Sequence, residues 1–86
     1  MYYVYLIKSK TNKLYIGSTN NLCKRLKEHQ NGRVFSTKNL DNIQLIYCES
    51  FKSEKDARLR EKQLKYHGKA YQELKKRLKN SLKGAG

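Results

Sequence analysis

The sequence predicts an α+β fold in which helices pack on the faces of a three-stranded, mainly antiparallel sheet. Three observations support this prediction. The chain has 86 residues, which is enough for one domain with a modest core. Three short segments are rich in aromatic and β-branched residues, and three more polar segments repeat apolar residues at helical spacing. The expected order is β-β-α-β-α-α, with a single domain over residues 1–82 and a flexible tail at 83–86.

The first two strands, YYVYLIKS and LYIGS, are expected to form a β-hairpin around the turn-forming residues SKTNK. A three-residue loop that pairs Ser9 with Lys13 places Tyr5 opposite Gly17 and diagonal to Tyr15. Both phenols then project from the same face of the sheet and can approach one ligand. Gly17 removes a side chain where another group must approach closely, or it is a simple turn residue.

A helix is expected over residues 21–30, where Thr19 or Asn20 can cap its first turn and Asn31-Gly32 ends it. Residues 33–42 are polar and are expected to form an irregular loop.

One face of this helix carries Leu22, Arg25, Leu26 and His29 at i, i+3, i+4 and i+7. We expect the two leucines to anchor the helix on the sheet, with Arg25 and His29 leaning toward the tyrosines. Arginine offers a planar fork that matches phosphate oxygens, and histidine can move a proton near neutral pH. The alternative is that both residues belong to a solvated basic face.

The remaining elements follow from the same patterns. A third strand is expected at residues 43–50, IQLIYCES. A helix is expected over 54–66, because Ser53 is followed by an acid three residues later in a capping-box arrangement. The last helix should span 70–82, with apolar residues at helical spacing: Tyr71, Leu74, Leu78 and Leu82.

Charge is the strongest global feature, since 20 Lys and Arg against 7 Asp and Glu give a net charge of +13. Such a surface attracts polyanions, which favours a nucleic-acid partner. No apolar run reaches the ~18 residues that a spanning helix needs, and the N-terminal stretch is too short for a signal peptide. Cys23 and Cys48 lack metal-ligand spacing and are expected to be reduced and partly buried. We therefore expect a cytoplasmic protein with no membrane partner.

Glu61 is an acid among bases, in ARLREKQLK, and lies near the inward side of its helix. Mg²⁺ is usually bound by a protein carboxylate together with water molecules and a substrate phosphate. No second cluster of acids is present, which argues against a two-metal site. The alternative is a surface glutamate that pairs with Lys65 at i+4, a contact worth only ~0.3–0.5 kcal/mol.

Taken together, these residues resemble the GIY-YIG nuclease family, and in particular its short stand-alone bacterial members. The order is Tyr-x9-Tyr-Ile-Gly-x7-Arg-x3-His, with a later Glu on a basic helix. The second motif, Tyr15-Ile16-Gly17, is intact, whereas Val4-Tyr5-Leu6 stands where the family name has Gly-Ile-Tyr. The resemblance covers nearly all of residues 2–82.

The resemblance implies a DNA endonuclease that hydrolyses phosphodiesters with one divalent ion, Mg²⁺ or Mn²⁺, and leaves 5′-phosphate and 3′-hydroxyl ends. Tyr15 would be the general base or the phenol that orients water, with Tyr5 hydrogen-bonded nearby. Arg25 would neutralise the phosphate oxygens, and Glu61 would hold the metal. His29 would assist proton transfer or hydrogen-bond the phosphate.

The resemblance also implies a substrate, double-stranded or branched DNA, in repair or recombination, with RNA as an alternative. Targeting would come from the basic helices, the loop at 33–42 or another protein, and a non-catalytic nucleic-acid binder is the alternative function. Gly17 and Asn80, a late asparagine, are further candidates. The residues expected to contact nucleic acid are Lys24, Lys27, Arg33 and Lys38.

Overall fold

A computed structural model describes residues 1–32 and 42–83. Its centre is an antiparallel three-stranded sheet in the order β2-β1-β3. The strands are β1 (Tyr2–Lys8), β2 (Leu14–Thr19) and β3 (Gln44–Phe51). The predicted α+β class and the three predicted strands are confirmed, and both β2 and β3 are edge strands.

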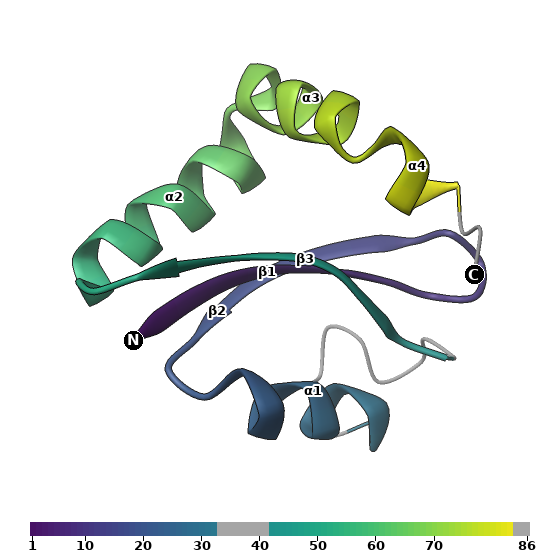
Figure 1. The fold of residues 1–86 in the computed structure, drawn as a ribbon, viewed down its shortest axis with the longest axis horizontal. Coiled ribbons are helices and arrows are strands. Elements are labelled where there is room, and N and C mark those ends of the chain that lie inside the picture. Colours follow the sequence, from purple (N-terminus) through teal and green to yellow (C-terminus); the bar gives the residue numbers. More distant parts are fainter. Residues whose placement is uncertain (33–41, 84–86) are drawn as a thin grey trace.

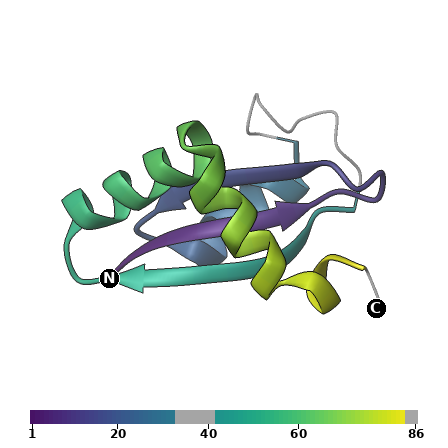
Figure 2. The same ribbon diagram turned by 90° about the horizontal axis from the view of Figure 1, so that it is seen from above.

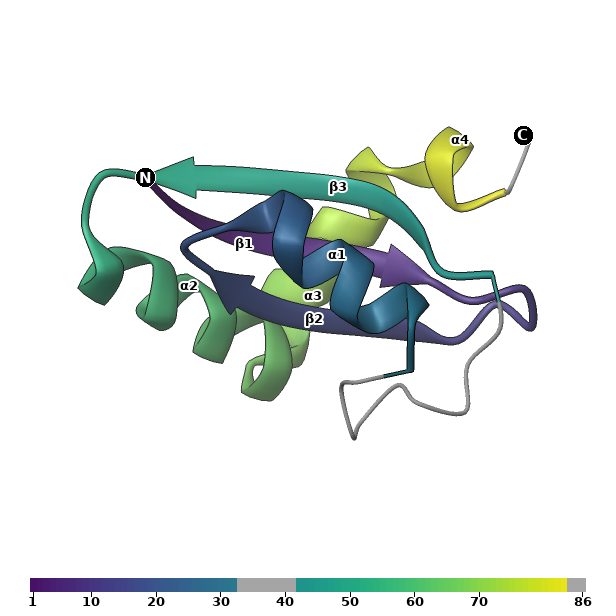
Figure 3. The ribbon, with the colours of Figure 1, turned by 90° about the horizontal axis from the view of Figure 1, so that it is seen from below.

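Helices cover both faces of the sheet (Figure 1). Of the helices in the described residues, α1 (Leu22–Gln30) covers one face, which Figure 3 shows from below. The other face carries α2 (Glu54–Tyr66), α3 (Gly68–Arg77) and the short α4 (Lys79–Leu82). Seen from above, α2 runs on the β2 side and α3 crosses over β1 (Figure 2). No helix in the described ranges is long and apolar enough to cross a membrane.

The hairpin has the predicted register. The Ser9 N–H donates to the Lys13 carbonyl at 2.9 Å, which leaves a three-residue loop with Asn12 at φ 66°. Asparagine tolerates this left-handed conformation better than most residues. Tyr5 therefore lies opposite Gly17, and because side chains alternate along a strand, Tyr5 and Tyr15 share the face that carries α1.

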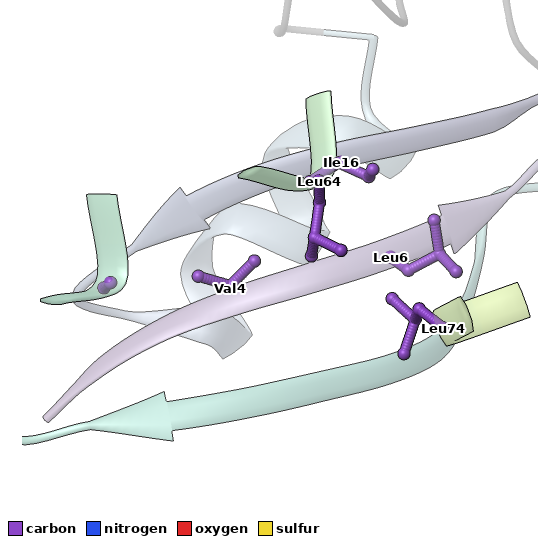
Figure 4. Close-up of a cluster of buried hydrophobic side chains, with 6 residues drawn as sticks. Val4, Leu6, Ile16, Leu64 and Leu74 are labelled. Atoms are coloured by element: carbon purple, nitrogen blue, oxygen red, sulfur yellow. The ribbon is translucent and has the colours of Figure 1, made fainter. Parts of the chain in front are cut away.

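Each face of the sheet has its own apolar cluster. On the α2–α3 side the buried residues are Val4, Leu6, Ile16, Ala57, Leu64 and Leu74. Figure 4 shows Leu64 and Leu74 meeting the side chains of β1 and β2. On the α1 side, Tyr5, Ile7 and Ile43 pack with half-buried Tyr15, Leu22 and Leu26. The predicted anchoring of the first helix by its two leucines is confirmed.

An ion pair fastens α2 to β3. The Arg60 Nε donates to both carboxylate oxygens of Glu49 at 3.1 Å, and Nη2 donates to Oε2 at 3.0 Å. The Tyr47 hydroxyl also donates to Glu49, at 2.9 Å. This geometry matches the planar fork of arginine to a carboxylate. It ties α2 to β3 at the residue before Glu61.

The predicted cap of α1 is wrong. The cap of α1 is Asn21, whose Oδ1 accepts from the Lys24 N–H at 3.1 Å. Thr19 ends β2, and its hydroxyl instead accepts from the Asn21 N–H at 3.1 Å, which turns the chain before the helix starts. Asn20, the other candidate cap, precedes Asn21 and is exposed.

The predicted helix over residues 70–82 is two helices. The chain leaves α3 at Leu78 and turns before α4, and the Lys8 ammonium donates to the Leu82 carbonyl at 3.1 Å. The apolar residues that predicted this segment still contact one cluster. At the start of α2 the prediction is confirmed, since the Ser53 side chain accepts from the Asp56 N–H.

Both cysteines are exposed and free, so the prediction that they are partly buried is wrong. Cys23 points away from the face of α1 that covers the sheet, and Cys48 lies on the edge strand β3. Most of the loop predicted at 33–42, and residues 84–86 of the predicted tail, lie outside the described residues.

Candidate functional site

Tyr5 is packed against the backbone of Gly17. The Tyr5 side chain is 2% exposed, and a Cβ added at Gly17 would lie 2.5 Å from Tyr5 Cζ and closer still to the hydroxyl oxygen. No side chain other than hydrogen fits between the two strands here without a shift. The close approach expected at Gly17 is therefore present, and its function is to admit the phenol.

His29 lies between the two tyrosines. Its side chain is 1% exposed, and its Nε2 is 2.8 Å from the Tyr5 hydroxyl oxygen. The edge-on contacts of its ring reach both phenols, with centroid distances of 5.5 Å to Tyr5 and 5.4 Å to Tyr15. Of the described residues in α1, His29 is the buried one, whereas the leucines beside it are half-buried.

The protonation states in this cluster follow from burial. Burial, followed by the positive charge of Arg25, lowers the pKa of His29 below its usual 6.5. Burial raises the pKa of Tyr5 to about 12, even though the neighbouring Arg25 guanidinium acts to lower it. Near neutral pH the imidazole is therefore uncharged and the phenol keeps its proton, and a hydrogen bond joins the Tyr5 oxygen to Nε2.

Arg25 joins this cluster to solvent. Its guanidinium interacts with Tyr5 and forms an ion pair of 3.6 Å with Glu28. Among the described residues its Nε is buried without a hydrogen-bond partner. The side chain lines a cavity of about 340 Å³ between the first turns of α1 and α2, together with Ser18, Lys24 and Arg58. Arg25 can thus meet an anion that enters from this side.

Glu61 approaches from the other face of the sheet, around the edge strand β2. Its Oε1 accepts from the Ser18 hydroxyl at 2.7 Å, and its Oε2 pairs with the Lys65 ammonium at 2.8 Å. Burial acts to raise the pKa of the Glu61 carboxyl, but hydrogen bonds from Lys65 and Ser18 outweigh it and hold the pKa below its usual value. The Lys65 Nζ lies 5.7 Å from the centroid of the Tyr15 ring.

The structure brings together six of the predicted site residues at the β2 edge: Tyr5, Tyr15, Gly17, Arg25, His29 and Glu61. Lys24 and Lys27 are exposed on α1, beside this cluster. Asn80 is exposed on α4, over the opposite face of the sheet from the phenols, and is not brought to them. Arg33 and Lys38 lie outside the described residues.

The sequence patterns do not predict two contacts of the site, those of Ser18 with Glu61 and of Lys65 with Tyr15. Ser18 follows Gly17 on the strand, so the alternation of side chains directs it toward α2, and that parity could have paired it with Glu61. Helical spacing predicts the pair of Glu61 with Lys65 as a surface contact, whereas in the structure the Lys65 ammonium group also lies near the Tyr15 ring. Both features are present in one cluster.

The Glu61 carboxylate is an oxygen donor of the type that a hard divalent cation accepts. Within residues 1–32 and 42–83 there is no group of three His, Cys, Asp or Glu side chains that could hold a metal ion. Glu61 nevertheless offers an ionised carboxylate whose side chain is 21% exposed. Mg²⁺ often binds through one or two carboxylates and keeps several waters, so Glu61 could hold Mg²⁺ or Mn²⁺ with substrate oxygens completing the shell.

Comparisons with known proteins identify the family of the chain. The family model described as the GIY-YIG catalytic domain matches residues 1–73. A UPF0213 protein of Clostridium perfringens is 42% identical over 76% of this chain and 71% of its own length. UPF0213 protein YazA of Bacillus subtilis is 36% identical over 90% of this chain and 75% of its own length. No solved structure matches the chain with significance. The chain belongs to the GIY-YIG nuclease family, alongside the UPF0213 proteins.

Proposed function

We propose that this protein is a divalent-metal-dependent DNA endonuclease that hydrolyses phosphodiesters with a single metal ion. One observation carries the proposal. Two phenols from one face of the sheet and an ionised carboxylate from a helix on the other face meet at the β2 edge. A cavity lined by the basic side chains of Lys24, Arg25 and Arg58 and the acidic side chains of Glu28 and Glu54 opens at Ser18, and we propose that a phosphate group approaches Arg25 through it.

Tyr15 is the phenol suited to act on water. It is half-buried, whereas Tyr5 is 2% exposed and is hydrogen-bonded to His29. Tyr15 would orient the attacking water or accept its proton as the water oxygen bonds to phosphorus. The bond from phosphorus to the 3′ oxygen then breaks, leaving a 5′-phosphate and a 3′-hydroxyl that takes up a proton.

Arg25 and Glu61 would handle the charge of the reaction. Arg25 faces the cavity and would stabilise the negative charge that grows on the non-bridging oxygens. Glu61 would hold Mg²⁺ or Mn²⁺, and the bound ion would stabilise the leaving 3′ oxygen.

His29 is better placed to hold the two phenols than to touch the phosphate. Its ring is almost entirely enclosed, and its Nε2 is hydrogen-bonded to the Tyr5 hydroxyl. We therefore assign it the role of fixing both rings, with any proton transfer passing through the Tyr5 hydroxyl.

The substrate that we propose is double-stranded or branched DNA, in repair or recombination. The family implies a nucleic-acid substrate, and the net charge of +13 favours binding of any polyanion. Lys24 and Lys27 are exposed on α1 next to the cluster and would contact neighbouring phosphates. Competition between RNA and DNA for the same protein separates the two substrates.

The test is cleavage of supercoiled plasmid and branched DNA with Mg²⁺, alongside a gel-shift measurement of binding. We expect the wild type to cut, and Glu61→Gln to bind DNA without cutting. Glu73→Gln is a matched control, because Glu73 is an exposed residue of α3 whose pair with Lys76 is 3.6 Å long. If the wild type and Glu61→Gln both shift DNA and neither cuts, the protein is a non-catalytic binder.

A further inference from the structure

Lys65 connects two groups of the site that come from opposite faces of the sheet. Its backbone is on α2, and its ammonium group pairs with Glu61 Oε2 at 2.8 Å. The same ammonium lies 5.7 Å from the centroid of the Tyr15 ring. The side chain therefore reaches past the β2 edge, from the helix that carries the acid to the strand that carries the phenol.

This arrangement differs from an ordinary surface ion pair on a helix. Nearer the start of α2, Arg58 and Glu54 also pair at i,i+4, but they are 3.8 Å apart and their side chains are 71% and 55% exposed. The side chains of Lys65 and Glu61 are 33% and 21% exposed, and Ser18 holds the other carboxylate oxygen. Helical spacing explains the contact with Glu61, but it does not explain the contact with the Tyr15 ring.

We propose, on the basis of the proposed function, that Lys65 is a further positioning residue of the site. Its ammonium group holds the Glu61 carboxylate against Ser18 and places a positive charge beside the Tyr15 phenol.

Two opposite effects follow from this position. The ammonium group competes with a divalent cation for Glu61, so it weakens metal binding to the free protein. During hydrolysis its contact with the Tyr15 ring holds that phenol in place to orient the attacking water, so it raises turnover. A residue that only stabilised the fold would not produce this split, because its loss would weaken metal binding and turnover together.

The experiment uses Lys65→Met, which keeps the aliphatic chain and removes the charge, and Lys65→Arg, which keeps the charge. Lys62→Met is the matched control, since Lys62 is exposed on the same helix and its replacement changes the net charge equally. Binding of Mn²⁺ to the nucleic-acid-free protein is followed by electron paramagnetic resonance of the free ion. Turnover of plasmid DNA is measured at saturating metal.

We expect Lys65→Met to bind Mn²⁺ about fivefold more tightly, the upper end for a partly exposed ion pair. Its kcat should fall about tenfold, in the range of a cation–aromatic contact. Lys65→Arg should recover most of the turnover, and Lys62→Met should match the wild type in both measurements.

Other results would overturn the Lys65 proposal, the proposed nuclease function or both. Unchanged or weaker Mn²⁺ binding by Lys65→Met overturns the proposal for Lys65, as does wild-type turnover at saturating metal. If the wild type binds Mn²⁺ but cuts no nucleic acid, the proposed nuclease function fails. The Lys65 proposal is then decided by Mn²⁺ affinity alone. If the wild type binds no Mn²⁺, both fail.

Discussion

Replacing Gly17 with alanine probes the contact on which the geometry of the site depends. The new Cβ would lie 2.5 Å from Tyr5 Cζ, well inside the 3.0 Å that real Cβ contacts respect. The Tyr5 ring is enclosed and its hydroxyl is 2.8 Å from His29 Nε2, so it cannot move without losing that hydrogen bond. Overpacking costs about 1–3 kcal/mol, and the loss of a buried hydrogen bond costs about 1–2 kcal/mol.

We therefore expect Gly17→Ala to lower the free energy of unfolding by about 2–5 kcal/mol in urea denaturation. It should also reduce cleavage, because the phenol is displaced. Gly68→Ala is the control, since a Cβ at Gly68 meets nothing within 4 Å and the residue begins α3. It should leave stability unchanged or raise it by up to about 1 kcal/mol.

A double-mutant cycle with Tyr5→Leu identifies the cause. If the clash with the phenol is responsible, the alanine should cost much less once the ring is gone. A Gly17→Ala protein that unfolds at the wild-type urea concentration would refute the steric reasoning. Equal costs of the alanine with and without the Tyr5 ring would show that the effect arises in the backbone.

Three further outcomes are expected. Arg60→Met should cost about 1–3 kcal/mol of stability in urea, because it leaves the Glu49 carboxylate without the Arg60 guanidinium. Arg58→Met, the control, should cost under about 0.5 kcal/mol. Equal costs of the two substitutions would contradict this prediction. Because burial lowers the pKa of folded His29 below 6.5, its contribution to stability is complete above that pH and is lost as pH falls, by at most about 1.4 kcal/mol per pH unit. In His29→Gln the free energy of unfolding should no longer fall with pH in this way when denaturation is measured at several pH values. If it falls as steeply as in the wild type, His29 is not the cause. Arg25→Ala should weaken both gel-shift binding and cleavage, and retained cleavage would remove Arg25 from the site.

Much of the hairpin could be predicted because strand geometry is local. The odd loop length sets which residues face each other, so the pairing of Tyr5 with Gly17 followed from the positions of Ser9 and Lys13. The helical face of α1 was equally accessible, since spacing alone places Arg25 beside the anchoring leucines.

The features that escaped prediction depend on tertiary contacts. His29 is more enclosed than the leucines of α1, because both tyrosine rings surround it. The break at Leu78 does not interrupt the apolar spacing and so has no local signal. The reach of Lys65 to Tyr15 depends on how α2 lies on the sheet, where the Arg60–Glu49 pair ties it to β3.

The most direct test of the central claim is a crystal structure of Tyr15→Phe with Mn²⁺ and an uncleaved DNA duplex. The account predicts one anomalous-scattering peak at the Glu61 carboxylate, and a phosphodiester between that ion and Arg25, facing position 15. A Mn²⁺ peak away from Glu61, or DNA bound only along the far helices with no phosphate near Arg25, would contradict it.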